Sequence, residues 1–261
     1  MLGSLAALDE GRPLRQVLFY RLCYWVLFIL FILVYRARFF GVDRVPRSGG
    51  LLVVCNHQSH LDPPLVGLSL RRRNMAAVAR ESLFRHWPLG WLLRSWGCIP
   101  INDEEGDAGA IRASIAQLKA GRVVVIYPEG SRSPDGGMFE FKRGAWLLMS
   151  RSGVDVIPAA VEGCYDAWPR RRAVPTLIGG RVAVQFGEVI PFAELKAMGV
   201  DRALDHLARE VDVLRHDLRE RLRTATCGRV PAPGPGDDAY SPRPMPETPR
   251  RGRKSQGSAR A

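Results

Sequence analysis

The part of the sequence from about residue 39 to residue 187 alternates short apolar runs with stretches of helical character. The run at 51–55 has the length of a buried strand, and in 107–120 Ile111, Ile115 and Leu118 recur with the spacing of one helix face. Alternating strands and helices predict an α/β sandwich in which helices flank a mixed sheet. The predicted strands are 51–55, 75–79, 98–101, 122–127, 156–161 and 181–186, and the predicted helices are 63–70, 88–96, 107–120 and 143–151.

The N-terminal segment is apolar over residues 17–35, where Arg21 is the only charged side chain. About 20 apolar residues cross a hydrocarbon core, so this segment is long enough to span a membrane or to lie deep in one leaflet. A cleaved signal peptide is an alternative, but no small-residue cleavage site follows Tyr35. A buried core helix is the other alternative. We predict a membrane-anchor segment over residues 1–38.

The C-terminal segment has a different composition from the rest of the chain. After Cys227 it is rich in Pro, Gly, Ser and Arg and has few large apolar residues. Such a segment cannot bury enough apolar surface to offset the entropy lost on ordering. We therefore predict a disordered tail over residues 227–261 and one folded domain over residues 39–226.

The chain is basic, with a formal net charge of +12. A basic balance favours an anionic membrane surface, nucleic acid or a polyanionic substrate as partner. One alternative is therefore a non-enzymatic protein that binds membrane or nucleic acid through the arginine runs 71–73 and 170–172 and the basic tail. Those runs lack the interleaved aromatic residues that would stack bases, so we do not expect a nucleic-acid partner.

The first polar motif is NHQSHLD at residues 56–62, between an apolar strand and an apolar helix. Asp62 is placed to begin the helix, and Asp is a favoured N-cap residue. An Asp at this turn can also accept a hydrogen bond from His57, which leaves the other imidazole nitrogen as a general base. A metal site built on His57, His60 and Asp62 is an alternative. No further ligand cluster completes it, so we predict no metal.

The second polar motif is YPEGSRS at residues 127–133, which also follows an apolar strand. The glycine after Glu129 permits a tight turn whose backbone N–H groups face a ligand, and Arg132 offers a guanidinium suited to phosphate. Lys142 adds a cation at the start of the next helix. A surface turn with a salt bridge is the alternative. The chain has no G-x-S-x-G elbow and no P-loop, which argues against serine hydrolases and nucleotide hydrolysis.

These two motifs, followed by VIPAA at residues 156–160, resemble blocks I, III and IV of the glycerolipid acyltransferases. This family includes the bacterial 1-acylglycerol-3-phosphate acyltransferases. The order of the blocks, their spacing and the apolar segment before them carry the resemblance, which covers roughly residues 40–190.

The resemblance implies transfer of a fatty acyl group from acyl-CoA or acyl carrier protein to the hydroxyl of a lysophospholipid. The implied acceptor is 1-acyl-sn-glycerol-3-phosphate and the product phosphatidate, in phospholipid biosynthesis. By the same resemblance His57 is the general base and Asp62 its orienting partner, without a metal or a cofactor other than the acyl donor. Because such donors are cytosolic, we expect a cell-membrane protein whose active site faces the cytoplasm. The implied substrate-binding residues are Asn56, Glu129, Gly130, Ser131, Arg132, Lys142 and Pro158.

One position departs from the family pattern. Block II reads Gly-x-Ile-x-x-x-Arg or near it, with the arginine on the acceptor phosphate, whereas this chain has Asp103 at the last position. A carboxylate there repels a phosphomonoester unless it turns away or pairs with a cation such as Arg132. Another lysolipid, or an amino-acid-derived lipid, therefore remains an alternative acceptor.

Overall fold

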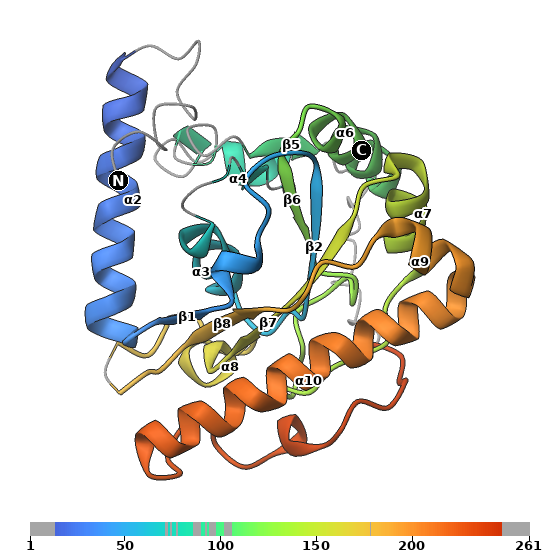
Figure 1. Cartoon of the computed structure of the whole chain (residues 1–261). Helices are drawn as coiled ribbons and strands as arrows, with labels where there is room; N and C mark the ends of the chain where they lie inside the picture. The colour runs from blue at the N-terminus through green and yellow to red at the C-terminus, as the bar shows by residue number, and fades with distance from the viewer. Residues whose placement is uncertain are drawn as a thin grey trace, which may run out of the picture.

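The computed structural model describes residues 14–246, apart from 71–72, 74, 77, 86–89, 92, 94–97, 102–105 and 178. Within these residues a six-stranded sheet has the order β1-β8-β7-β2-β6-β3 (Figure 1). Strands β7, β2, β6 and β3 are parallel, whereas β8 is antiparallel to β7 and parallel to β1. The sheet is therefore mixed, as predicted. The strands are β1 (Arg38–Phe40), β2 (Leu51–Cys55), β3 (Met75–Ala76), β6 (Val123–Ile126), β7 (Val156–Glu162) and β8 (Ala183–Phe186).

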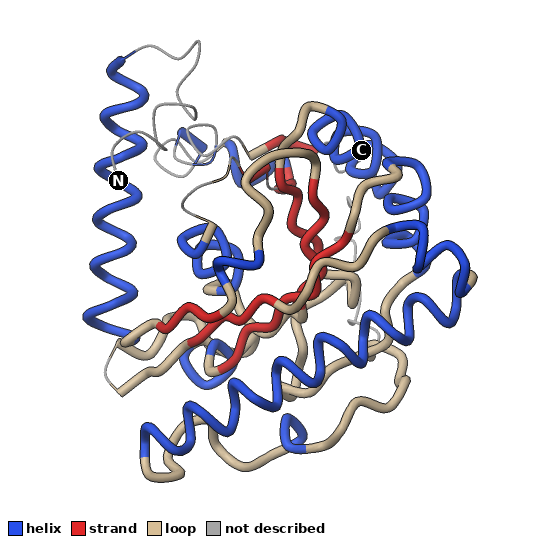
Figure 2. The backbone as a smooth tube through the Cα atoms, viewed as in Figure 1, coloured by secondary structure: helices blue, strands red, loops and turns tan. Residues whose placement is uncertain are grey.

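Helices cover both faces of this sheet, which confirms the α/β sandwich (Figure 2). All residues of the central strand β2 are buried: Leu52 and Val54 face one helical layer, and Leu51, Val53 and Cys55 face the other. A strand covered on both sides reads as a continuous apolar run, which is why β2 is conspicuous in the sequence. One layer holds α6 (Gly106–Lys119), α7 (Arg143–Ser152), α9 (Phe192–Met198) and α10 (Val200–Thr226), and the other holds α2 (Leu14–Tyr35), α3 (Asp62–Ser69) and α8 (Cys164–Ala167).

Two details differ from the expected elements. The apolar run at 75–79 is divided between two sheets, because β3 joins the main sheet and β4 (Val78–Arg80) pairs with β5 (Ile99–Ile101). Next to this second sheet lies the short helix α4 (Glu81–Phe84). The helix predicted at 88–96 falls largely outside the described residues.

The apolar segment near the N-terminus forms α2, which packs along the domain. Phe31 and Tyr35 are buried, and the Tyr24 hydroxyl donates a hydrogen bond to the carbonyl of Leu68 in α3 at 2.9 Å. No helix in the described part of the chain has the length and apolarity needed to cross a membrane. The predicted membrane anchor is therefore not confirmed. The outer side of α2 exposes large apolar side chains, namely Leu18, Leu22, Trp25, Val26, Ile29, Leu30 and Leu33.

Residues 228–246, here called the C-terminal strap, turn back after α10 and follow that helix (Figure 1). Arg219 forms an ion pair with Asp237 at 2.7 Å, and Arg243 reaches Asp135 at 2.9 Å. Arg215 also donates to the carbonyl of Gly236. The predicted disorder is thus wrong for the strap, because ion pairs and hydrogen bonds replace the apolar burial that it lacks. Residues 247–261 lie outside the described part.

Candidate active site

The two polar motifs meet because their strands are neighbours in the sheet. Strands β2 and β6 are parallel, with Val54 opposite Ile126, so the turns that follow them leave the same edge. The backbone N–H of Ser133 donates to the carbonyl of His57 at 2.7 Å. The backbone N–H of His57 donates to Glu129 Oε1, also at 2.7 Å. Residues 72 positions apart in the chain are therefore joined by direct hydrogen bonds.

Asp62 holds the imidazole of His57. The distance from His57 Nδ1 to Asp62 Oδ2 is 2.8 Å, and the Asp62 side chain is fully buried. The same oxygen accepts the backbone N–H groups of Gln58 at 2.6 Å and Ser59 at 2.7 Å. Asp62 does begin α3, but the prediction that it caps the helix is wrong, because Leu61 is the N-cap residue and the carboxylate turns back to the preceding turn.

The remaining surface of the imidazole is partly open. The ring of His57 stacks on that of Tyr127, with centroids 4.2 Å apart, and its side chain is 19% exposed. Nε2 has no hydrogen-bond partner among the described residues. Since Nδ1 faces a carboxylate, the favoured neutral tautomer carries its proton on Nδ1 and leaves a lone pair on Nε2. A hydroxyl that reaches Nε2 meets a general base.

Glu129 fixes the backbone of the turn that carries His57. Its two carboxylate oxygens accept the backbone N–H groups of His57 and of Phe139, the latter at 3.0 Å. Burial raises the pKa of Glu129 to about 8, and the two N–H bonds oppose that rise. Glu129 is buried and both of its oxygens accept backbone N–H groups, so the contacts in the structure fix the turn; its predicted contact with substrate stays a prediction.

Two further predicted substrate-binding residues are buried in the sheet. The side-chain amide of Asn56 makes two hydrogen bonds with the backbone of Val161 in β7, at 2.8 and 3.0 Å. Pro158 lies in β7 opposite Val54, and its ring contacts Gly187. The structure shows both side chains held within the sheet, and their predicted contacts with substrate stay a prediction. The sequence could not show this, because it depends on the pairing of β2 with β7.

Three of the other four predicted binding residues lie on the turn after β6, and the fourth, Lys142, precedes α7 and reaches Gly130 with its side chain. Gly130 has a φ of +75°, and a Cβ at this position would lie 2.7 Å from Lys142 Nζ. Ser131 Oγ accepts a hydrogen bond from Arg170 at 3.0 Å. Arg132 is half-buried and makes no hydrogen bond or ion pair with another described residue. The structure thus brings Gly130, Ser131, Arg132 and Lys142 together, and sequence reasoning missed Arg170 as part of this group.

Two alternatives from the sequence concern His60 and the arginine run at 71–73. The ring of His60 lies 5.2 Å from that of Trp168, and no group of three His, Cys, Asp or Glu side chains in the described ranges could hold a metal. Arg73 is buried and donates to backbone carbonyls, among them those of Ser48 and Gly121 at 3.1 Å. Asp103, Arg71 and Arg72 lie outside the described residues.

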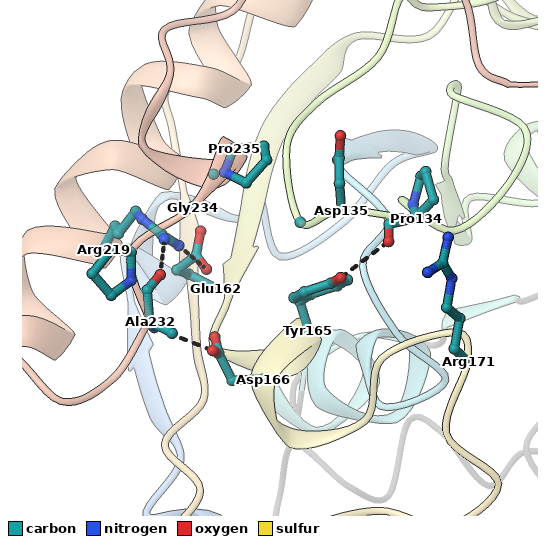
Figure 3. A pocket seen from close by; sticks show the side chains of 13 residues that line it. Pro134, Asp135, Glu162, Tyr165, Asp166, Arg171, Arg219, Ala232, Gly234 and Pro235 are labelled. Carbon is teal, nitrogen blue, oxygen red and sulfur yellow. Dashed lines mark hydrogen bonds and ion pairs between the residues drawn. The ribbon is translucent and has the colours of Figure 1, made fainter.

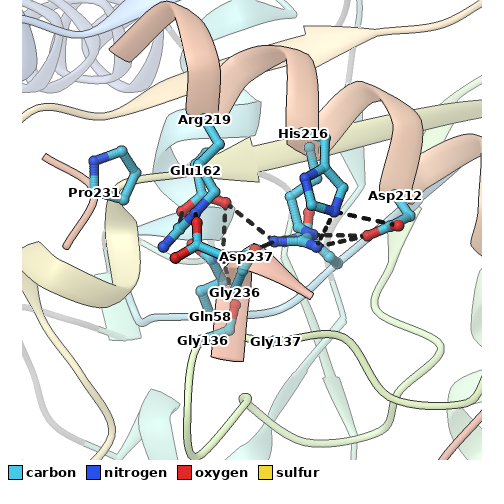
Figure 4. Close-up of polar contacts among 12 residues, drawn as sticks. Gln58, Gly136, Gly137, Glu162, Asp212, His216, Arg219, Pro231, Gly236 and Asp237 are labelled. Carbon is cyan, nitrogen blue, oxygen red and sulfur yellow. Dashed lines mark hydrogen bonds and ion pairs between the residues drawn. The ribbon is translucent and has the colours of Figure 1, made fainter. Parts of the chain in front are cut away.

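A buried charge cluster lies next to residues 56–62 and Glu129, which we call the catalytic turn after the role predicted for His57 (Figure 4). Glu162, the last residue of β7, forms ion pairs with Arg219 at 3.0 Å and with Arg215 at 3.7 Å. Arg219 in turn pairs with Asp237 of the C-terminal strap. We call Glu162, Arg215, Arg219 and Asp237 the arginine cluster. Gln58 connects it to the catalytic turn, because its Nε2 lies 3.4 Å from Glu162 Oε2 while its backbone N–H donates to Asp62.

Comparison with known proteins agrees with this geometry. A family model described as Acyltransferase matches residues 36–162. The chain is 30% identical over 241 residues to the 1-acyl-sn-glycerol-3-phosphate acyltransferase alpha of Bos taurus, covering 89% of this chain and 77% of that relative. It is 30% identical over 138 residues to the chloroplastic 1-acyl-sn-glycerol-3-phosphate acyltransferase LPAT1 of Arabidopsis thaliana, of which it spans only 38%.

The fold has a counterpart among solved structures. The crystal structure of the 1-acyl-sn-glycerophosphate (LPA) acyltransferase PlsC from Thermotoga maritima superposes with a TM-score of 0.62 at 23% identity, covering 84% of this chain and 87% of that one. At this identity the likeness concerns the fold. Together with the match to the bovine relative, the family model shows that this chain belongs to the glycerolipid acyltransferase family.

Proposed function

We propose that this protein transfers a fatty acyl group from an acyl thioester to the hydroxyl of 1-acyl-sn-glycerol-3-phosphate and so forms phosphatidate in phospholipid biosynthesis. The acyl donor is acyl-CoA or acyl carrier protein. The names of the relatives support this acceptor. The observation that carries the proposal is the contact between His57 Nδ1 and the buried Asp62 Oδ2 at 2.8 Å, with Nε2 left for a hydroxyl.

The reaction follows from this arrangement. His57 Nε2 takes the proton of the acceptor hydroxyl while the hydroxyl oxygen attacks the thioester carbonyl and forms the new C–O bond. The nearby Asp62 carboxylate stabilises the imidazolium. When the tetrahedral intermediate collapses, the C–S bond breaks and the imidazolium returns its proton to the leaving thiolate. No covalent bond between enzyme and acyl group is required.

Two cations near Gly130, Arg132 on the turn after β6 and Lys142 at the start of α7, supply the acceptor site. Arg132 and Lys142 flank Gly130, and neither makes a hydrogen bond or ion pair through its side chain with a described residue. Unpaired cations beside a general base suit an anionic headgroup, and a guanidinium fits the geometry of phosphate oxygens.

We further propose that α2 holds the protein on the cytoplasmic surface of the cell membrane, where a lipid acceptor is found. The exposed apolar side of α2 supports this, since Leu33 is 72% exposed and Leu22 is 61% exposed. A large exposed apolar surface is typical of an interaction with another apolar phase. Co-sedimentation with vesicles of anionic phospholipid tests it. Replacing Leu22, Trp25 and Leu33 with Ser is expected to abolish binding, and unchanged binding would contradict the proposal.

The activity is tested by following free thiol from acyl-CoA in the presence of lysophosphatidate. We expect His57→Ala to lower kcat on the order of 10²–10⁴-fold, because it removes the general base. His206→Ala on α10 is the matched control and is expected to retain the wild-type rate. A His57→Ala rate equal to that of the wild type would refute the mechanism. A panel of other lysolipids and amino-acid-derived lipids, assayed with the same donor, identifies the acceptor.

A further inference from the structure

The loop at residues 168–172 carries three consecutive arginines that the mechanism does not use. It follows α8 and is fastened to the catalytic turn, because Ser59 Oγ donates to the carbonyl of Trp168 at 2.8 Å. The ring of Trp168 also contacts that of His60, with centroids 5.2 Å apart. The loop is therefore held beside the residues that surround His57.

The side chains of the three arginines of this loop point to different places. Arg170 Nη1 donates to Ser131 Oγ at 3.0 Å, which places its guanidinium on the turn after β6. Arg171 lines a separate cavity of about 410 Å³ between the C-terminal strap and the segment at Pro134 (Figure 3). Arg172 bonds to the hydroxyl of Thr176. Only Arg170 is directed at the residues of the candidate acceptor site.

Arg170 and Arg132 are close enough to influence each other. Burial first, and then the charge of Arg170, lower the pKa of Arg132, while Asp62 raises it. Two like charges held together on a half-buried surface repel each other unless an anion lies between them. Arg132 has no ion-pair partner in the described part of the chain. Arg132 therefore lies within electrostatic range of both Arg170 and Asp62, which is the carboxylate beside His57.

We propose that Arg170 and Arg132 together bind the phosphate of the acceptor and that this pair favours a phosphate monoester over a diester. This inference rests on the proposed function. A monoester has a second pKa near 6 and carries a charge of about −1.5 to −2 at neutral pH. A diester carries a single negative charge, so the second guanidinium stabilises it less. Ser131 fixes Arg170 in place for this contact.

The test compares Arg170→Ala and Arg170→Gln with the wild type in the thiol-release assay. We expect both variants to raise KM for lysophosphatidate on the order of 10-fold, since a hydrogen bond to a charged group is lost. KM for acyl-CoA is expected to stay within about twofold of the wild-type value, because the donor phosphate does not use this pair. Arg171→Ala is the matched control and is expected to change neither value.

Charge selectivity is tested by adding lysophosphatidylglycerol, a diester, as a competitor of lysophosphatidate. Its inhibition constant is expected to change by less than about threefold in Arg170→Ala. If this constant and KM for lysophosphatidate rise by the same factor, the selectivity is refuted. If KM for lysophosphatidate is unchanged, or rises together with KM for acyl-CoA, the role of Arg170 is refuted.

A binding measurement separates this inference from the proposed function. Lysophosphatidate is titrated into His57→Ala and into His57→Ala/Arg170→Ala, so that no acyl transfer is needed. Weaker binding on the order of 10-fold in the double variant supports the arginine pair even if the wild type transfers no acyl group. Equal binding refutes the pair even if the wild type is active.

Discussion

The catalytic turn and the arginine cluster both bury carboxylates at the ends of neighbouring strands, but they stabilise these carboxylates by different means. In the turn, backbone N–H groups and one imidazole surround Asp62, and Glu129 accepts only backbone N–H groups. In the arginine cluster, two guanidinium groups surround Glu162. Gln58 makes hydrogen bonds with Asp62 of the catalytic turn and with Glu162 of the arginine cluster, so a single residue connects the two regions.

This difference distinguishes the groups that can transfer a proton from those that only stabilise the fold. Burial raises the pKa of Glu162, and the charges of Arg219 and Arg215, which stay protonated at any physiological pH, oppose that rise. Backbone N–H groups fix the position of a carboxylate without titrating or adding a full opposite charge. In the proposed reaction, the imidazole of His57 is therefore the group beside Asp62 that takes and returns the proton of the acceptor hydroxyl.

The largest effect is expected when the catalytic turn is broken. Asp62→Asn keeps the shape of the side chain but removes the charge that stabilises imidazolium and selects the Nδ1–H tautomer. We expect kcat to fall on the order of 10²-fold or more, measured by thiol release. The control is Asp201→Asn, which removes the exposed partner of Arg143 and is expected to leave kcat unchanged. A rate within about threefold of wild type for Asp62→Asn would show that the carboxylate is not needed.

Breaking the arginine cluster is expected to affect stability more than catalysis. Arg219→Met leaves Glu162 buried with one cation fewer and frees Asp237 of the C-terminal strap. We expect the free energy of unfolding in urea to fall by about 3–5 kcal/mol, the usual cost of leaving a buried charge partly unpaired. Arg221→Met, which removes an exposed pair with Asp217 on the same helix, is expected to cost about 0–1 kcal/mol. Equal losses in the two variants would show that the cluster contributes no more than a surface pair.

The pH dependence of the free energy of unfolding tests the contribution of Glu129 in the catalytic turn. Its pKa rises from 4.5 to about 8 on folding because of burial, so the folded protein binds a proton that the unfolded chain releases. The contribution of Glu129 to stability is therefore complete below about pH 4.5 and is lost as the pH rises through about 8. Glu129→Gln is expected to cost about 1–3 kcal/mol at low pH, because one backbone N–H loses its acceptor. Urea titrations across this range are expected to show a smaller pH slope for Glu129→Gln, and an unchanged slope would assign the titration to another group.

The smallest effect is expected at the end of the C-terminal strap. Arg243 pairs with Asp135 at 2.9 Å and lies over the ring of Phe139, 4.1 Å from its centroid. Both charged groups are partly exposed, so Arg243→Ala is expected to cost about 1 kcal/mol. Since Phe139 N–H bonds Glu129, a larger loss accompanied by a fall in kcat would show that the strap also supports the catalytic turn.

Much of the fold could be predicted because its signals are local. The apolar runs of β2, β6, β7 and β8 are short and sharply bounded, and the helix faces repeat with the expected period. The C-terminal strap could not be predicted from composition, since its order depends on Arg215 and Arg219, which lie on a different element. The division of 75–79 between two sheets likewise depends on strands far away in the chain.

For the site, the sequence by itself determined the pair of His57 and Asp62 and the turn at Gly130 and Arg132. His57 and Asp62 lie a few positions apart after one apolar strand, and Gly130 and Arg132 lie a few positions apart after another. Local backbone geometry therefore brings the members of each pair together. The tertiary structure alone decided that Asn56 and Glu129 face inward and that Arg170 reaches Ser131. Each of these contacts joins segments separated by at least ten residues. Their positions follow from strand pairing and loop packing, which the type of a side chain does not encode.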